Sequence, residues 1–157
     1  MQGNTEVIAK LNGLLAGELT AIDQYFIHGR MCREWGLARL ADHFGHEMQE
    51  EQMHAGRLIA RILFLEGLPV MDQREPLHVG ADIPEMLKND LNLEYRVIAN
   101  LRESIALCEK SLDFTTRDVL LDLLRDTEED HTLWLETQLG LIGKIGLENY
   151  LQSQIQT

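Results

Sequence analysis

Apolar residues recur three and four positions apart along four long stretches of the chain, which is the spacing of amphipathic helices. The pattern predicts helices over about 5–35, 37–66, 84–112 and 113–142, followed by a short amphipathic helix over 147–155. Leu, Glu, Ala and Ile dominate and favour helix, whereas the β-branched clusters typical of strands are absent. We therefore expect an all-α protein.

The ends of these helices carry the usual start and stop signals. Thr5 is the predicted N-cap of the first helix and Asp82 that of the third. Gly67 followed by Pro69 ends the second helix. Three residues could cap the fourth: Asp113, Thr115 and Thr116.

The lengths of the links predict the topology. Helices one and two, and three and four, are joined by a few residues each, so each pair should form an antiparallel hairpin. A helix of about 28 residues is roughly 42 Å long, and the roughly 16-residue link over 67–82 can extend to about 53 Å. It can therefore return the third helix parallel to the second. We expect residues 1–157 to form one domain, a four-helix bundle with one long crossover and a short C-terminal fifth helix.

Acids and histidines interrupt the middle of every apolar stripe. Burying an isolated carboxylate costs several kcal/mol or more, and no basic residue lies on these stripes to offset the charge. Several carboxylates meeting in one core would repel one another. Four glutamates balance two divalent cations, and neutral histidines complete the coordination.

The spacing supports a dinuclear metal site. Glu51 and His54, and likewise Glu128 and His131, form E-x-x-H pairs, and residues three apart share a helix face. The preceding helices add one glutamate each, 33 and 34 residues before the pairs. Such carboxylate and imidazole ligands suit iron or manganese, whereas zinc could not do redox chemistry. The predicted ligands are Glu18, Glu51, His54, Glu94, Glu128 and His131.

Composition and charge narrow the function classes. The chain weighs 18.0 kDa and carries a formal net charge of −12, which disfavours nucleic acid and anionic membranes as partners. The charge suits a protein that attracts cations, although solubility alone would also explain it. The N-terminus shows no signal peptide, and two cysteines without metal-ligand spacing favour a cytoplasmic location.

The chain resembles the bacterioferritins and related bacterial ferritins along nearly its whole length. The resemblance is carried by segments 18–28, 62–69, 90–94, 135–142 and 146–154. It implies a ferritin-like fold in a hollow shell of 24 subunits, which stores iron as a ferric mineral. The six ligands match the family's ferroxidase centre, where two iron ions are bound and Fe(II) is oxidised by O2 or H2O2. It implies further that Glu51 and Glu94 bridge the two ions and that Tyr25 stands beside them.

The chain departs from the bacterioferritin pattern in two places. Gln52 stands where that family has its haem-binding methionine, and an amide is a poor ligand for haem iron. Met48 and Met53 do not share that position on the helix. The sequence therefore predicts a haem-free homo-oligomer, or a subunit mixed with a haem-binding bacterioferritin subunit. The family resemblance further implies a ferredoxin-type reductant that releases the iron. The second departure is one extra residue between Glu94 and Glu128, which a bulge in the fourth helix could absorb.

Further residues near the predicted site admit two interpretations. His46, Glu47 and Glu50 could relay iron between the centre and the cavity, or simply form a solvated helix face; Glu47 could instead support a histidine ligand. We interpret the remaining histidines as surface or interface residues: His28, His43 and His78.

Other functions remain open on sequence grounds. The same ligands would serve a di-iron or di-manganese oxidase without storage, and Gln52 is compatible with a structural subunit of a mixed shell. The lack of rubredoxin-like cysteine pairs argues against a rubrerythrin-type peroxidase. The acidic balance argues against a nucleoid-binding mini-ferritin.

Overall fold

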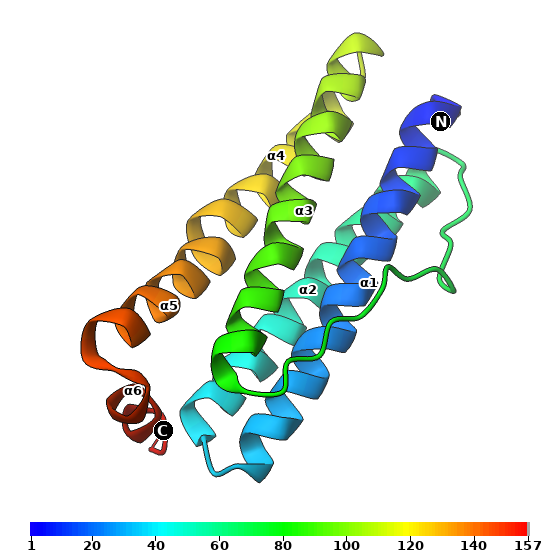
Figure 1. Cartoon of the computed structure of the whole chain (residues 1–157). Coiled ribbons are helices and arrows are strands. Elements are labelled where there is room, and N and C mark those ends of the chain that lie inside the picture. Colours follow the sequence, from blue (N-terminus) through cyan, green and yellow to red (C-terminus); the bar gives the residue numbers. More distant parts are fainter. Residues whose placement is uncertain (157) are drawn as a thin grey trace.

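The computed structural model describes residues 1–156 and is built from helices (Figure 1). Within that range there is no strand, and no helix is both long and apolar enough to cross a bilayer. The prediction of an all-α four-helix bundle with a short C-terminal helix is confirmed. The elements are α1 (Thr5–Glu34), α2 (Ala38–Phe64), α3 (Ile83–Lys110), α4 (Phe114–Asp126), the π-helix η1 (Thr127–Thr132), α5 (Leu133–Ile145) and α6 (Leu147–Ser153).

The helices form two antiparallel hairpins, α1 with α2 and α3 with the continuous rod of α4, η1 and α5. The crossover (residues 65–82) leaves the end of α2 near the N-terminus and runs along α1 to the opposite end of the bundle. There it starts α3, which runs parallel to α2 (Figure 1). The long crossover is thus as the linker length predicts. Helix α6 folds back across the end of the bundle where α1 turns into α2.

The caps agree with the sequence at two of three helix starts. Asp82 and Asp113 cap α3 and α4, each accepting a hydrogen bond from the backbone three residues on. The cap of α1 is Asn4, whose Oδ1 accepts from the backbone N–H of Glu6 at 2.8 Å. The prediction of Thr5 was wrong by one residue, because Asn is the better cap and its amide oxygen reaches the free N–H groups of the first turn.

The apolar core is divided in two by a buried polar band. One cluster, around Leu11, Leu58 and Leu101, fills the half of the bundle near the N-terminus. The other, around Phe44 and Met86, fills the opposite half. Between them every long helix places acids or histidines inside the bundle. Apolar packing on both sides therefore fixes the position of this band.

Helix η1 contains the extra residue in the fourth helix. Its six residues have π-helical hydrogen bonding between two ordinary α-helical segments. A π-helix widens the turn by one residue and lets the rod continue in the same direction. The predicted bulge is therefore confirmed, and it lies at the level of the polar band.

The crossover is held to the outer face of α1 by hydrogen bonds between α1 side chains and crossover backbone N–H groups. His28 is the last of these side chains and is fully buried, with Nδ1 3.0 Å from a carboxylate oxygen of Asp90. Its interpretation as a surface or interface residue was wrong, because the crossover buries a face of α1 that a simple hairpin would leave exposed. The four acceptors are Asn12 for Val70, Thr20 for Glu75, Gln24 for His78 and His28 for Gly80.

We predict that His28→Ala destabilises the protein by about 2–4 kcal/mol. The substitution leaves the buried Asp90 carboxylate without its imidazole and the Gly80 N–H without its acceptor. Denaturant unfolding followed by circular dichroism measures the effect. His78→Ala is the matched control: this side chain is exposed on the same crossover, and its loss should change stability by no more than about 0.5 kcal/mol. Equal stability of the two variants would contradict the anchoring role of His28.

Candidate metal centre

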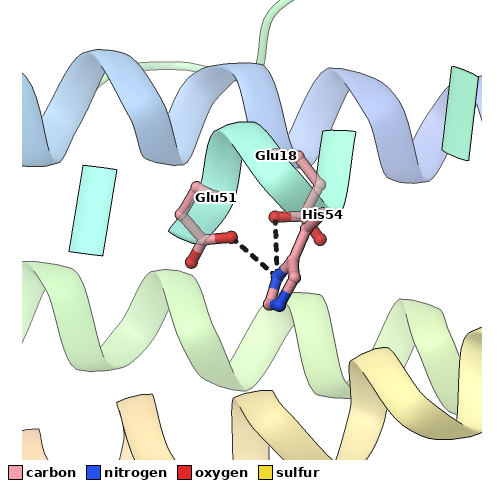
Figure 2. Close-up of side chains that lie close together, drawn as sticks. All are labelled: Glu18, Glu51 and His54. Atoms are coloured by element: carbon pink, nitrogen blue, oxygen red, sulfur yellow. Dashed lines mark hydrogen bonds and ion pairs between the residues drawn. The ribbon is translucent and has the colours of Figure 1, made fainter. Parts of the chain in front are cut away.

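Glu18 of α1 meets Glu51 and His54 of α2 inside the bundle, as Figure 2 shows. His54 Nδ1 lies 3.1 Å from Glu51 Oε2 and 4.0 Å from Glu18 Oε2. Neither carboxylate oxygen of Glu18 has a hydrogen-bond partner among residues 1–156, although both are shielded from solvent. Buried oxygens without donors cost free energy unless a cation occupies the space between them.

A second group of donors adjoins the first through Glu51. Its other oxygen, Oε1, lies 2.9 Å from Nδ1 of His131 in η1. The same nitrogen is 3.6 Å from Glu94 Oε1 of α3. Glu51 therefore presents one oxygen to each histidine, which is the arrangement expected of a carboxylate between two cations. The structure brings together five of the six predicted ligands in this way.

Tyr25 stands beside the second group. Its hydroxyl donates a 2.5 Å hydrogen bond to Glu94 Oε1, and the side chain is buried. Burial and the negative charge of Glu94 both raise the pKa of Tyr25 well above its ordinary value. Tyr25 thus remains a neutral donor that orients the Glu94 carboxylate.

Glu128, the sixth predicted ligand, points away from the other five. Its carboxylate accepts a 2.6 Å hydrogen bond from Arg102 on the bundle surface. The E-x-x-H argument assumes α-helical geometry, whereas Glu128 and His131 both lie in η1, where the wider turn separates residues three apart. Glu47 and Glu50 lie nearer to His131: Glu47 Oε2 is 3.4 Å from Nδ1 and Glu50 Oε2 is 2.9 Å from Nε2.

The predicted relay residues divide between interior and surface. Glu47 is buried, whereas the His46 side chain is 60% exposed. Glu50 lies between them and binds His46 through one oxygen, with 3.2 Å from Oε1 to Nε2, and His131 through the other. A row of imidazole and carboxylate side chains, which are of types that can bind metal ions, therefore leads from the surface to the candidate centre.

Sequence reasoning missed Asp126, which ends α4. Its Oδ2 lies 3.5 Å from Nε2 of His54, on the opposite side of the ring from the two glutamates. A signal was available: the extra residue in the fourth helix indicates a π-turn, in which residues five apart share a face. Asp126 and His131 are five apart, so the same bulge that turns Glu128 outward brings Asp126 to the centre.

Several buried carboxylates lie close together in the site, and their crowding shifts the pKa values of the groups around them. Burial, together with the charge of Glu51, raises the pKa of Glu18 well above its usual value, and burial likewise raises the pKa of Glu51. Burial raises the pKa of Glu47 to about 7. For His131 burial alone would lower the pKa, but Glu51 and Glu94 outweigh it and raise the pKa well above the ordinary range. Two divalent cations would supply the positive charge that these carboxylates lack.

Fold and site together define a class: a four-helix bundle whose core holds paired carboxylate and histidine ligands suited to a dinuclear metal centre. A family model described as "Ferritin-like domain" matches residues 8–145. A curated bacterial ferritin of Synechocystis sp. is 58% identical over 155 residues, covering 99% of each chain. A bacterial ferritin of Pseudomonas aeruginosa is 57% identical over 155 residues, covering 99% of this chain and 100% of the relative.

Bacterioferritins are more distant but still similar over the full length. The bacterioferritin of Brucella melitensis is 43% identical over 152 residues, covering 97% of this chain and 94% of the relative. The chain belongs to the bacterial ferritin and bacterioferritin family, as the sequence resemblance predicts. Membership in this family supports a role in iron storage.

We predict that the metal-free protein becomes less stable as the pH rises from about 4.5 through 7. The sign follows from proton binding: a buried Glu47 with a pKa of about 7 holds its proton where the unfolded chain, with a pKa near 4.5, has released it. Folding then becomes less favourable by up to about 3 kcal/mol for this group. His131 acts in the same direction, because its raised pKa adds stability below pH 6.5 that is lost at higher pH.

Denaturant unfolding in the presence of a chelator tests this dependence. Glu47→Gln should flatten the pH profile, whereas Glu129→Gln, an exposed acid of η1, should leave it unchanged. A metal-free protein whose stability increases steadily over the same interval would contradict the assignment.

Proposed function

We propose that the protein oxidises Fe(II) to Fe(III) at a dinuclear ferroxidase centre and stores the product as ferric mineral inside a hollow oligomeric shell. The proposed ligands are Glu18, Glu51, His54, Glu94, Glu128 and His131. The observation that carries the proposal is Glu51, whose two oxygens face the two histidines. Within residues 1–156 the carboxylates around it have no lysine or arginine partner. Membership in the family supports a role in iron storage.

Glu51, Glu94 and Tyr25 have distinct parts in the proposed reaction. Glu51 spans the two iron substrates and, with Glu94, holds them close enough to react with one oxidant molecule. Two Fe(II) ions each lose one electron, and O2 takes up the two electrons and two protons to give H2O2. H2O2 can serve as the oxidant in the same way, giving water. Tyr25 keeps Glu94 oriented through its hydroxyl hydrogen bond.

Glu128 completes the centre in this proposal by releasing Arg102 and turning inward. The Arg102–Glu128 ion pair lies at the surface and is worth no more than about 1 kcal/mol, which cation binding can exceed. Glu47 is already inside and is the competing sixth ligand. If Glu128 is the sixth ligand, the half of the centre around His131 changes its shape when iron binds. If Glu47 is the sixth ligand, that half is already formed.

The proposed assembly is a homo-oligomer of about 24 subunits without haem. Gln52 lies on the exposed face of α2, at the position of the family's haem ligand. The same residue favours the alternative of a partner subunit in a mixed shell, where a bacterioferritin subunit supplies the haem. A ferredoxin-type reductant would release the stored iron in either case. The remaining alternative is a di-iron oxidase without storage.

We predict rapid oxidation of about two Fe(II) per chain when the anaerobically loaded protein meets air. Near-ultraviolet ferric absorbance follows the reaction. Glu51→Ala should abolish the fast phase because it removes the carboxylate between the two ions. Glu129→Ala, an exposed acid of η1, should behave like the parent protein. Continued uptake far beyond two irons, in particles of shell size by gel filtration, supports storage.

The outcome separates the alternatives. A fast phase that stops near two irons per chain would favour an oxidase without storage. Oxidation no faster than in protein-free buffer would contradict a ferroxidase and favour the partner-subunit role. Retention of the fast phase in Glu51→Ala would overturn the proposed centre.

We predict that His46→Ala slows iron uptake into the cavity while leaving the initial oxidation of about two irons per chain intact. His46 is exposed and bonds to Glu50 at the outer end of the row of side chains that reaches His131. Stopped-flow absorbance separates the fast phase from the slow one. His78→Ala removes an exposed histidine elsewhere and serves as the control. Unchanged slow uptake in His46→Ala would contradict the relay.

A further inference from the structure

Both histidines of the centre are held between two carboxylates. Each turns Nδ1 toward Glu51 and Nε2 away from it. Outside, Glu50 Oε2 lies 2.9 Å from Nε2 of His131, and Asp126 Oδ2 lies 3.5 Å from Nε2 of His54. The two rings are nearly parallel, with an interplanar angle of 14° and centroids 5.5 Å apart. Both outer nitrogens therefore face a carboxylate, which lies within hydrogen-bond distance for His131 and somewhat farther away for His54.

The two carboxylates that face the outer nitrogens, those of Glu50 and Asp126, each come from the hairpin that does not carry the histidine they face. Glu50 belongs to α2 and contacts the histidine of η1, whereas Asp126 ends α4 and contacts the histidine of α2. Both line a cleft of about 250 Å³ that also contains Asp130. Each hairpin thus supplies a histidine and also the acid that faces the other hairpin's histidine.

A neutral imidazole can bind a metal through one nitrogen only when its proton is on the other. A carboxylate at the outer nitrogen accepts that proton, fixes the ring orientation and increases the basicity of the inner nitrogen. We propose that Glu50 and Asp126 are positioning residues, which hold the protons of His131 and His54 on Nε2 and direct both Nδ1 lone pairs toward the metal ions. This inference rests on the dinuclear centre of the proposed function.

Glu50 can serve both in the iron relay with His46 and in the positioning of His131, because each role uses a different carboxylate oxygen. Its Oε1 contacts His46 and its Oε2 contacts His131, so each oxygen has one partner. Asp126 contacts no second histidine within residues 1–156, so orientation is its whole role in this scheme. The Asp126 side chain is 53% exposed, and its removal should not disturb the fold.

Titration of the metal-free full-length protein with Zn(II), followed by calorimetry, tests the inference without redox chemistry. The parent protein should bind about two Zn(II) per chain. Glu50→Ala and Asp126→Ala should each weaken one of the two sites by roughly 10- to 100-fold. Asp126→Glu keeps the carboxylate and should restore affinity. Asp130→Ala removes the same charge from the same cleft, without a histidine contact, and should bind nearly as the parent does.

Solid-state ¹⁵N spectra of histidine-labelled, Zn-loaded protein give a second readout. In the parent, His54 and His131 should carry the proton on Nε2 and the metal on Nδ1. In Asp126→Ala the His54 signals alone should change, and in Glu50→Ala those of His131 alone. Changes of this kind would not accompany a general loss of negative charge or stability.

The possible results distinguish a failure of the positioning role from a failure of the proposed dinuclear centre. Parent-like affinity and spectra in both alanine variants would overturn the positioning role while leaving the centre intact. A third Zn(II) that disappears in Glu50→Ala, with the other two unaffected, would assign Glu50 to a separate metal site instead. Failure of the parent to bind two Zn(II) would overturn the dinuclear centre, and this inference with it.

Discussion

Excess negative charge in the middle of the bundle is the constraint on which the rest of the structure depends. Four glutamates are buried at one level: Glu18, Glu47, Glu51 and Glu94. Burial raises the pKa of Glu18, Glu47 and Glu51, and no lysine or arginine within residues 1–156 forms an ion pair with any of the four. Hydrophobic packing must therefore hold together groups that repel one another. The two apolar clusters on either side supply this packing. The protein keeps a cation site ready at the expense of its own metal-free stability.

The crossover makes the first hairpin the firmer half of this arrangement. It covers the outer face of α1, and side chains of α1 bind its backbone at four points. In the described part of the chain no crossover covers the second hairpin, and the rod of that hairpin is interrupted by η1 at the level of the site. Glu18 and His54 thus lie on continuous α-helices, whereas His131 lies on a π-turn. The two halves have related sequences but unequal mechanical support.

The sequence was sufficient for the helices, the topology and the meeting of five of the six predicted ligand residues, because all of these follow from local periodicity and linker length. It was not sufficient for Glu128, since E-x-x-H places two side chains on one face only when the helix is regular. The extra residue indicated a bulge, but the directions of the side chains around the bulge depend on which residues the wider turn includes. His28 was misread for a different reason: its burial results from a segment more than fifty residues away, and nothing in the local pattern of α1 reports that contact. Asp126 was missed for both reasons: it adjoins the irregular turn of η1, and it contacts His54, which is distant in the sequence.

The π-turn also determines how this protein can change. Helix η1 holds six residues where the surrounding helices would accommodate five, and the chain enters and leaves it in the same direction. Gain or loss of a single residue there would leave the bundle, the crossover and the apolar clusters in place while rotating a different acid toward His131. Such a change would alter the candidate ligand set without any substitution at the ligand positions themselves. A change in the length of η1 would therefore alter which acids reach the candidate metal centre, while the fold would remain the same.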